Sequence, residues 1–267
     1  MLSELTGRRA LVTGASGGLG PVIARALHAR GALVVLSGRR VDALEALAAE
    51  LGENAEVEPA DLSDRADLER MVELSKGLDV LVANAALPAS GWLEEFSPEQ
   101  IDRALDVNLR APIRMARAAA PEMAARGGGS LVFVSSLSGK MATAGQSLYS
   151  ATKYGLRGFA FGLHQELRDA GVGVTTVFPG FVSGAGMFAD TGLDAPRGTG
   201  TSTPEQVAAA VLRGIETRRA EIDVAPLNVR LGVRAHALAP SMVAAISRRL
   251  GAADVAAQIA ERQREKR

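Results

Sequence analysis

The sequence contains no cysteine, and this absence excludes disulfides, thiolate catalysis and sulfur-ligated metal sites. It also lacks any uninterrupted apolar run near the roughly 20 residues that a membrane-spanning helix needs. Thirty basic and thirty acidic residues cancel, so bulk charge gives no reason to expect a nucleic-acid partner. The first nine residues contain no apolar signal core. These absences suit a reducing cytoplasm, which is the compartment that we expect.

Candidate metal ligands are scarce as well. The three histidines, His28, His164 and His236, are scattered through helix-like stretches. No carboxylate and histidine stand at a spacing that indicates a metal site. We therefore expect no metal.

The apolar and charged residues that are present follow a regular alternation. They make up 47% and 22% of the chain, as in a globular protein with a real core. Short, nearly continuous apolar runs predict strands of a parallel sheet that is covered on both faces. The expected strands span residues 10–13, 32–36, 55–58, 80–83, 130–134 and 172–178. The expected helices span residues 19–30, 41–51, 64–76, 98–126, 147–170 and 205–216.

This alternation predicts an α/β fold, a Rossmann-like, doubly wound parallel sheet flanked by helices. It runs without a break to about residue 224, so we expect one catalytic domain over residues 1–224. Residues 183–202 follow a strand end, are rich in Gly, Thr, Asp and Pro, and are long for a plain connection. We interpret them as a mobile substrate lid, with an inert surface loop as the alternative.

A glycine-rich turn follows the first expected strand and opens the first helix, between Thr13 and Gly20. Glycines there allow a tight turn and let the backbone approach a pyrophosphate, whose charge meets the helix N-terminus. Pro21 is compatible, because an N–H in the first turn of a helix has no intrahelical partner. The strand–turn–helix context predicts dinucleotide binding by Gly14, Ser16, Gly17, Gly18, Leu19 and Gly20.

Three polar residues carry the predicted chemistry. Tyr149 and Lys153 lie four residues apart in an expected helix, thirteen positions after Ser136. Residues four apart share a helix face, so the ammonium would lie beside the phenol and lower the pKa of Tyr149 below about 10. Such a tyrosine suits a general acid in reduction and a base in oxidation. Ser136 would stabilise the charge that develops on the substrate oxygen.

Asn108 stands at a break in the expected helix 98–126. Ile101, Leu105, Asn108 and Pro112 follow a helical stripe, which predicts that Asn108 faces the core. Pro112 lacks the N–H that would bond the Asn108 carbonyl, and its ring crowds that carbonyl. We expect a kink that frees this backbone oxygen; a polar core residue at a kink is the alternative.

With these pieces together, the sequence resembles the short-chain dehydrogenase/reductase family. It is similar to the branch with a Thr-Gly-x-x-x-Gly-x-Gly turn and a Tyr-x-x-x-Lys active site, over roughly residues 5–180 and more loosely to about residue 224. The resemblance implies that Tyr149, Lys153 and Ser136 are catalytic. It also implies that Lys153 binds the nicotinamide ribose, and that Asn108 holds a water linked to this lysine in a proton relay.

The same resemblance implies further cofactor contacts, and the sequence departs from the family at three positions. Ala83 and Ala86 replace an asparagine and a glycine of a motif that mostly stabilises the sheet. Gly184 stands where the family often has a threonine that contacts the nicotinamide carboxamide, and Ser183 beside it is the possible substitute. Besides Tyr149, Lys153 and the glycine turn, the implied cofactor contacts are Asp61, Leu62, Asn84, Pro179, Gly180 and Val182.

The end of the second strand bears on the choice of nicotinamide cofactor. An acidic residue near Gly38 would accept from the ribose 2′-hydroxyl of NAD, but here glycine is followed by Arg39 and Arg40. A guanidinium pairs well with a 2′-phosphate. We therefore favour NADP(H) over NAD(H), with Arg39 as the leading contact; two solvated arginines are the alternative.

These features predict an NADP(H)-dependent oxidoreductase that interconverts a carbonyl and a secondary alcohol on a small to medium, partly apolar substrate. The alternative is a dinucleotide-binding sensor without turnover, since fold alone does not establish function. The complete set of Ser136, Tyr149 and Lys153 argues against that alternative. By analogy with the family, we expect a homodimer or homotetramer built on helices 98–126 and 147–170.

Residues 225–267 are expected to form a C-terminal helical extension, with helices over residues 241–250 and 253–266. From Asn228 onward, eight basic residues stand against three acidic ones. A basic amphipathic stretch of this kind could rest on a membrane surface. It could equally pack over the substrate cleft or across a subunit interface, and we favour these two over membrane contact.

Overall fold

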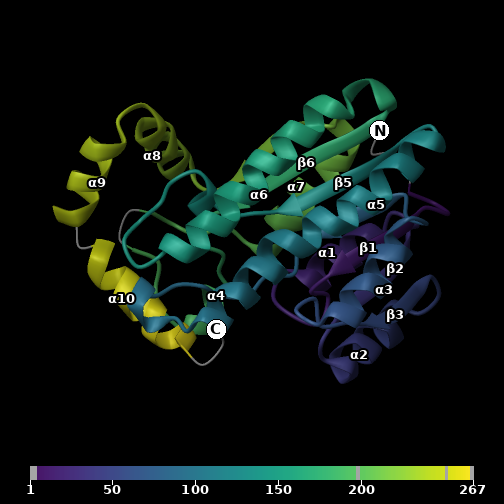
Figure 1. Ribbon diagram of the computed structural model, residues 1–267, viewed down its shortest axis with the longest axis horizontal. Coiled ribbons are helices and arrows are strands. Elements are labelled where there is room, and N and C mark those ends of the chain that lie inside the picture. Colours follow the sequence, from purple (N-terminus) through teal and green to yellow (C-terminus); the bar gives the residue numbers. More distant parts are fainter. Residues whose placement is uncertain (1–4, 197–198, 250–251, 265–267) are drawn as a thin grey trace.

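The computed structural model describes residues 5–196, 199–249 and 252–264. Within them, seven parallel strands form one sheet in the order β3-β2-β1-β4-β5-β6-β7. The predicted Rossmann-like class is confirmed (Figure 1). The strands are β1 Arg9–Thr13, β2 Leu33–Gly38, β3 Ala55–Pro59, β4 Val80–Ala83, β5 Gly129–Val134, β6 Val172–Pro179 and β7 Glu221–Val224.

Helices cover both faces of the sheet, three on each. Their apolar sides form two buried clusters with the strands between them. One face carries α1 Gly20–His28, α2 Val41–Leu51 and α7 Pro204–Thr217. The other face carries α3 Arg65–Ser75, α5 Ala111–Ala125 and α6 Ser147–Glu166.

The strands are apolar throughout because both of their faces are buried. In β1, Ala10 and Val12 pack into one cluster and Leu11 into the other. Successive side chains of a strand point to opposite faces, so a two-sided core needs apolar residues at every position. The strand order reverses between β1 and β4, and sheets of this kind bind ligands beside such a switch, at the carboxyl ends of the strands.

The prediction of a single helix over residues 98–126 is wrong. The chain forms α4 Pro98–Leu105, a π-helical turn η2 Asp106–Arg110, and then α5. The N–H of Ala111 donates to the carbonyl of Asp106, five residues back. Pro112, which has no N–H to donate, follows immediately. The expected kink therefore takes the form of a π-turn, a feature that is frequent at functional sites.

Two elements were not among the predicted ones. The strand β7 is short, and only Ile222 and Val224 of its four side chains are buried, so its apolar signal is weak. The helix α8 Leu227–Leu238 begins directly after Pro226. The predicted helix over residues 147–170 is also shorter, because α6 gives way to a 3-10 turn, η4 Arg168–Ala170.

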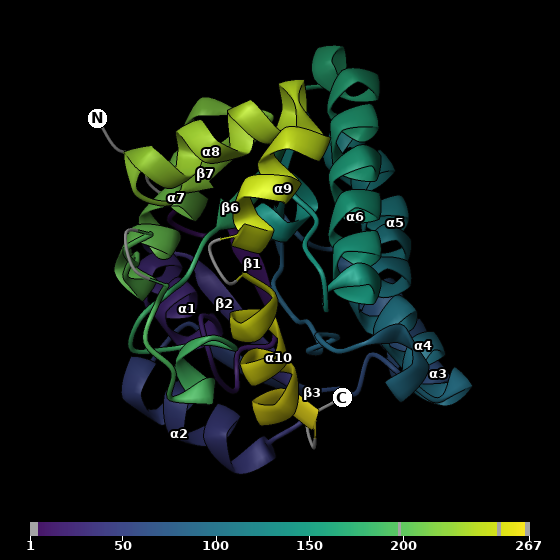
Figure 2. The same cartoon turned by 90° about the vertical axis from the view of Figure 1, so that its left-hand side faces the viewer.

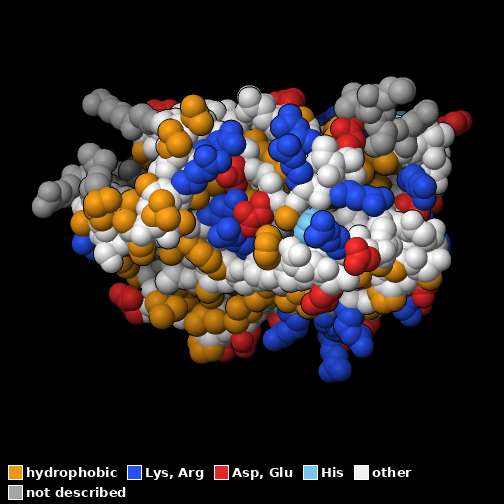
Figure 3. Space-filling model, turned by 90° about the horizontal axis from the view of Figure 1, so that it is seen from above, with side chains coloured by type: hydrophobic (Ala, Val, Ile, Leu, Met, Phe, Trp, Pro, Cys, Tyr) orange, Lys and Arg blue, Asp and Glu red, His pale blue; other side chains and the backbone are white. Residues whose placement is uncertain are grey.

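Three helices follow β7, namely α8, α9 Pro240–Arg249 and α10 Ala252–Gln263. Figures 1 and 2 show them along one end of the molecule, where α10 crosses in front of the sheet. Hydrophobic side chains gather toward this end in Figure 3. Residues 265–266 of the expected last helix lie outside the described residues. In the described part of the chain, no helix has the length and apolar character that crossing a bilayer requires.

Candidate active site

The glycine turn joins the carboxyl end of β1 to the N-terminus of α1. Gly14 and Gly18 have φ of 69° and 60°, where side chains are disfavoured. A Cβ on Gly20 would lie 2.1 Å from the carbonyl oxygen of Gly14, so the turn has no room for one. The backbone at the start of α1 can thus be approached closely by a ligand. This cradle fits the pyrophosphate of a dinucleotide.

The turn is held in place by a clamp between β1 and β4. The Thr13 hydroxyl oxygen accepts hydrogen bonds from the N–H groups of Asn84 and Ala85, at 3.1 and 3.0 Å. The Asn84 side-chain amide donates to the Thr13 carbonyl at 3.0 Å. A Cβ on Gly14 would come within 2.9 Å of the Ala85 Cα. Asn84 therefore lies beside the turn, with its amide engaged in holding the two strand ends together.

The arginines after β2 lie in different places. The Arg40 guanidinium reaches back over the glycine turn and donates to the Ser16 carbonyl. Arg39 is exposed and acts electrostatically on Asp61. A Cβ on Gly38 would lie 2.6 Å from the Ser16 hydroxyl oxygen, so β2 ends against the turn. Sequence reasoning named Arg39 as the leading contact and missed the reach of Arg40, because the direction of a long side chain depends on tertiary structure.

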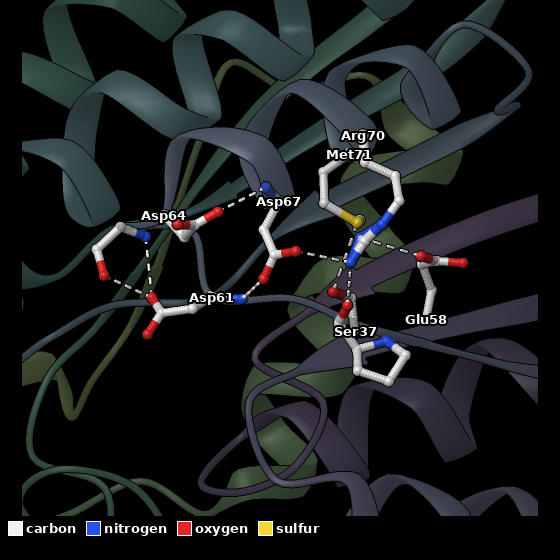
Figure 4. A network of polar contacts seen from close by, with 9 residues as sticks. Ser37, Glu58, Asp61, Asp64, Asp67, Arg70 and Met71 are labelled. Atoms are coloured by element: carbon white, nitrogen blue, oxygen red, sulfur yellow. Dashed lines mark hydrogen bonds and ion pairs between the residues drawn. The ribbon is translucent and has the colours of Figure 1, made fainter.

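Asp61, at the carboxyl end of β3, belongs to a polar network at the start of α3 (Figure 4). Its carboxylate accepts from the Ser63 N–H at 2.9 Å and from the Ser63 hydroxyl at 2.6 Å, and its own N–H donates to Asp67 at 2.8 Å. Burial raises the pKa of Asp61, but the Ser63 hydrogen bonds and the charges of Arg39 and Arg103 leave it below its usual value.

Leu62 points into the apolar core, where it is buried with the helices that cover this face of the sheet. Any contact of this residue with a ligand would therefore involve its backbone. Asp61 and Leu62 both lie at the carboxyl edge of the sheet, as the family resemblance implies.

The three predicted catalytic side chains come together at the carboxyl end of β5. Ser136 precedes a 3-10 turn, η3 Leu137–Gly139, and its hydroxyl oxygen accepts from the Ser138 N–H at 3.1 Å. Tyr149 lies in the first turn of α6 and is hydrogen-bonded to Ser136. The Nζ of Lys153 lies 5.6 Å from the centre of the Tyr149 ring and donates to the Val134 carbonyl at 3.2 Å.

A glycine allows the serine-bearing turn to touch α6. A Cβ on Gly139 would lie 2.7 Å from the Lys153 carbonyl oxygen and 2.9 Å from the Ser135 hydroxyl oxygen. The Ser135 hydroxyl donates to that same carbonyl at 3.2 Å. Ser135 is therefore a structural neighbour that joins η3 to α6, while Ser136 faces Tyr149.

Burial controls the protonation of the tyrosine and the lysine. It raises the pKa of Tyr149 to about 12, although the hydrogen bond with Ser136 acts in the opposite direction. It lowers the pKa of Lys153 to about 8, because a buried ammonium loses its hydration. The expectation that Lys153 lowers the pKa of Tyr149 is therefore wrong for the protein alone: desolvation of the phenolate dominates, and the Lys153 charge itself is destabilised.

Asn108 is 1% exposed and lies within the π-turn. Its side-chain oxygen accepts from the Leu87 N–H at 2.7 Å, and its amide donates to the Leu87 carbonyl at 3.0 Å. The amide also lies 3.5 Å from the hydroxyl of Thr152, next to Lys153. The predicted buried position is confirmed. The side chain fixes the segment after β4 to the helix layer.

A charge network that sequence reasoning missed supports the serine-bearing turn η3. Lys140, the residue after η3, lies 2.6 Å from an Asp223 oxygen and 2.8 Å from a Glu221 oxygen in β7. The second Glu221 oxygen lies 2.6 Å from the Arg157 Nε, one turn beyond Lys153 in α6. The serine-bearing turn, the tyrosine-bearing helix and β7 are thereby joined through buried or half-buried charges.

The aromatic ring of Phe178 completes this network. The Lys140 Nζ lies 4.0 Å from the ring centre, and the Lys140 side chain is only 9% exposed. Burial raises the pKa of Glu221, but hydrogen bonds from Arg157 and Lys140 hold it below its usual value. The sequence signal that could have predicted this network was the spacing of Glu221 and Asp223, because residues two apart in a strand share a face.

The chain after β6 returns across the glycine turn. Pro179 ends β6, and the Gly180 N–H donates to the Val224 carbonyl at 3.0 Å. Val182 forms an isolated parallel bridge with Ser202, so the base of segment 183–202 is closed.

Segment 183–202 lies near the predicted cofactor position. A Cβ added to Gly18 would lie 3.4 Å from the Gly186 Cα, so the segment lies over the glycine turn. The Ser183 hydroxyl lies 3.3 Å from the Ser202 carbonyl, to which it donates. Its hydroxyl is therefore already engaged within the segment.

Aromatic side chains lie on two sides of this region. Phe96 is buried in a small cluster against which Tyr149 packs. Phe181 and Phe188 contact each other within or beside segment 183–202, with ring centres 4.6 Å apart. Trp92 is 41% exposed. Among the described residues, no group of three His, Asp or Glu side chains could hold a metal ion.

Comparison with known proteins agrees with this geometry. A sequence model of the family described as short chain dehydrogenase matches residues 8–195. This chain belongs to the short-chain dehydrogenase family. The match covers β1 to β6, the glycine turn and the Ser136, Tyr149 and Lys153 positions, and it ends before α7.

Individual members of the family are similar over most of the chain. Nodulation protein G of Rhizobium sp. (strain N33) is 42% identical over 186 residues, covering 68% of this chain and 76% of its own. Ketoacyl reductase HetN of Nostoc sp. (strain PCC 7120) is 37% identical over 231 residues, covering 84% and 80%. A short-chain dehydrogenase from Sphingobium yanoikuyae, solved in complex with NADPH, superposes with a TM-score of 0.75 at 30% identity, covering 81% and 87%.

The family membership establishes the class of reaction. This short-chain dehydrogenase is an NAD(P)-dependent oxidoreductase that acts on carbonyl and alcohol groups.

Proposed function

We propose that this short-chain dehydrogenase is an NADP(H)-dependent enzyme that interconverts a ketone or aldehyde and the corresponding alcohol, with Tyr149 as the acid and base. The observation that carries the proposal is the meeting of Ser136, Tyr149 and Lys153 at the carboxyl edge of the sheet, the same edge at which the glycine turn lies. A carbonyl oxygen that lies between Ser136 and Tyr149 would accept hydrogen bonds from both hydroxyls.

The proton chemistry follows from burial. With a pKa near 12, Tyr149 carries its proton at neutral pH, as the acid in carbonyl reduction must. Ser136 stabilises the negative charge that develops on the substrate oxygen before that proton arrives. Lys153, whose pKa of about 8 lies near neutrality, resupplies the proton and binds the nicotinamide ribose.

A nicotinamide dinucleotide, when bound, supplies or accepts the hydride. The glycine turn and the N-terminus of α1 would hold its pyrophosphate. Asn108 supports the relay from Lys153 to solvent through its anchoring of the segment after β4. The side chains of Asn108 and Lys153 are held by hydrogen bonds with backbone groups, so little reorganisation of them is needed during reaction.

The preference for NADP(H) over NAD(H) is supported by the end of β2. Gly38 is packed against Ser16, so an acidic side chain has no room there. Arg40 lies over the turn and the charge of Arg39 acts on Asp61 at the same edge of the sheet, and a guanidinium suits a 2′-phosphate. The Sphingobium yanoikuyae structure holds NADPH.

The preference for the phosphorylated cofactor can be tested at Arg39. We expect Arg39→Asp to raise the KM for NADPH about tenfold, because a charge-assisted hydrogen bond is lost, and to leave the KM for NADH within about twofold. Initial rates with both cofactors measure this, with Arg168→Asp, a change outside this region, as the control. An equal change in both KM values would show that Arg39 does not select the 2′-phosphate.

The substrate is proposed to be small to medium in size and partly apolar. This is supported by the position of Phe96 against Tyr149 and by the Phe181–Phe188 pair near the glycine turn. The Nostoc relative is named a ketoacyl reductase, which supports a ketone as the reacting group.

A homo-oligomer built on α5 and α6 is part of the proposal. The outer side of α6 carries Tyr154 and Phe161, which are 37% and 50% exposed, and Gly158 and Gly162 lie open beside them. Apolar rings next to glycines suit close helix packing against a second copy. Light scattering after size exclusion would measure the mass, and a monomer would contradict this part.

The enzyme assay is NADPH oxidation with a panel of ketones, aldehydes and quinones. We expect turnover of at least one class by the wild-type chain. Cofactor binding, followed by fluorescence, without turnover across the panel would instead support the sensor that lacks catalysis.

A further inference from the structure

The last helix, α10, buries one side against the rest of the molecule. Four residues on this side are 5% exposed or less. Their spacing of three, one and three residues follows a single helix face. They are Ala256, Ile259, Ala260 and Gln263.

The segments that α10 covers are those around the catalytic tyrosine. Ala256 lies 3.3 Å from the position of a Cβ on Gly145, four residues before Tyr149. Gln263 donates from its amide nitrogen to the Met187 carbonyl in segment 183–202, at 3.1 Å.

The end of α10 reaches a third segment. Arg264 lies 3.8 Å from Glu95, the residue before Phe96. These segments follow β5, β6 and β4 respectively, and Figure 2 shows α10 lying in front of the sheet between them. Phe96 belongs to the cluster against which Tyr149 packs, so these contacts place α10 over the segments that flank the tyrosine of the proposed reaction.

Among the described residues, only one of the two polar atoms in the Gln263 side chain has a hydrogen-bond partner. Its nitrogen bonds Met187, but its oxygen Oε1 is buried and has no hydrogen-bond partner among the described residues. Buried side-chain oxygens are almost always paired, so an unpaired one in a helix that covers the segments around Tyr149 points to a ligand that donates. The Gln263 oxygen is an acceptor, and its partner must be an O–H or N–H group.

We propose that α10 forms the outer wall of the substrate site and that Gln263 accepts a hydrogen bond from a second polar group of the substrate. This rests on the proposed function, because the reacting carbonyl is placed at Ser136 and Tyr149. The preferred substrates are carbonyl compounds that carry a hydroxyl or amide N–H in addition to the carbonyl. Reduction of a hydroxyketone would yield a diol.

Matched substrate pairs test this proposal. Each pair joins a plain ketone and its hydroxyl analogue: butanone and acetoin, acetophenone and hydroxyacetophenone, cyclohexanone and hydroxycyclohexanone. For the full-length protein we expect a higher kcat/KM for the hydroxyl member of at least one pair. The quantity compared between variants is the ratio of the two kcat/KM values within that pair.

Three variants distinguish the effect of losing the hydrogen-bond acceptor from the effect of disturbing the packing of α10. Gln263→Leu removes the acceptor at similar volume and should lower the ratio about tenfold, the effect of losing one buried hydrogen bond. Gln263→Glu keeps an acceptor oxygen and should keep the ratio within about threefold of wild type. Gln258→Leu, on the exposed side of α10, is the matched control and should leave the ratio unchanged.

The outcomes distinguish this proposal from the proposed function. An equal fall in kcat/KM for both members of each pair, or equal ratios for Gln263→Leu and Gln263→Glu, would overturn the role of Gln263 while leaving the oxidoreductase intact. A change confined to the KM for NADPH would place Gln263 at the cofactor and also overturn it. Turnover of plain ketones with no preference for hydroxyl members overturns it as well. Absence of turnover for every pair and for the wider panel would overturn both proposals.

Discussion

The part of the molecule that is built on the sheet, called the body below, differs from the three helices after β7 in how its polar groups are held. In the body, Thr13, Asn108 and Lys153 are buried and bonded to backbone groups. Among the described residues, three buried side-chain atoms in the C-terminal helices have no hydrogen-bond partner, in Arg230, His236 and Gln263, against one in the body, in Ser150. Leu238 is 88% exposed. Local stability follows the density of buried contacts, so the body provides a rigid catalytic frame and the helices provide a more readily opened cover.

The largest expected effect lies in the body, at the tyrosine. Tyr149→Phe removes the transferable proton while keeping the ring, so we expect kcat to fall about a thousandfold. Tyr154→Phe, five residues along the same helix and partly exposed, is the control and should retain activity. Steady-state rates of carbonyl reduction measure both. Full activity of a folded Tyr149→Phe protein would remove the proposed mechanism.

The buried charge network should account for the next largest effect. Lys140→Met leaves Asp223 without the cation that it pairs with and leaves Glu221 with Arg157 alone. We expect about 3 kcal/mol less stability, because the Asp223 charge has little exposure. Lys76→Met removes an exposed ion pair with Glu73 and should cost less than about 1 kcal/mol.

Urea unfolding of both lysine variants makes this comparison. Similar losses in the free energy of unfolding for the two variants would mean that the buried network stabilises the protein no more than an exposed ion pair does. The body would then not be stabilised by its buried charges.

The pH dependence of stability should also distinguish the buried body. The pKa of Lys153 is about 8 in the folded protein and ordinarily 10.5, so the unfolded chain binds more protons between these values. Stability therefore rises with pH in this window, by roughly 2 kcal/mol between about pH 8 and about pH 9.5. Tyr149 acts in the opposite direction only above pH 10, where the unfolded phenol ionises before the folded one.

The measurement is urea unfolding of wild-type and Lys153→Met proteins across that window. The variant should lack the rise. If the free energy of unfolding changed equally with pH in the two proteins, burial would not destabilise the charged form of Lys153.

The smallest effect is expected on the outer side of the C-terminal helices. Leu238→Ala changes a side chain that touches little protein and should alter stability by less than about 0.5 kcal/mol. Val233→Ala, on the buried side of the same helix, should cost roughly 2 kcal/mol through loss of packing against Leu137 and Phe178. Thermal unfolding compares them. A large loss for Leu238→Ala would mean that the exposed side is packed in solution.

The sequence sufficed for the features that rest on local rules. The periodicity of apolar runs predicted six of the strands, because a two-sided core requires apolar residues at each strand position. The spacing of Ser136, Tyr149 and Lys153 predicted their meeting, since residues four apart on a helix share a face. Gly14 and Gly20 marked the turn because only glycine fits there.

Other features escaped prediction because they depend on groups far apart in the chain. Lys140 finds its carboxylates in β7, 81 and 83 residues later. The stretch containing Asn108 and Pro112 predicted a kink, but its π-helical form depends on packing against neighbouring segments. The unpaired oxygen of Gln263 has no signature in a helix of ordinary amphipathic pattern.

The sequence by itself determined the alternation of the first six strands with their helices and the glycine turn, and it picked out the proposed catalytic side chains, because each rests on short motifs and local periodicity. Only the tertiary structure decided the protonation of Tyr149 and Lys153, since desolvation depends on what surrounds a group and not on its neighbours in the chain. It also decided that α10 lies over the segments around the tyrosine, because that contact joins residues more than seventy positions apart.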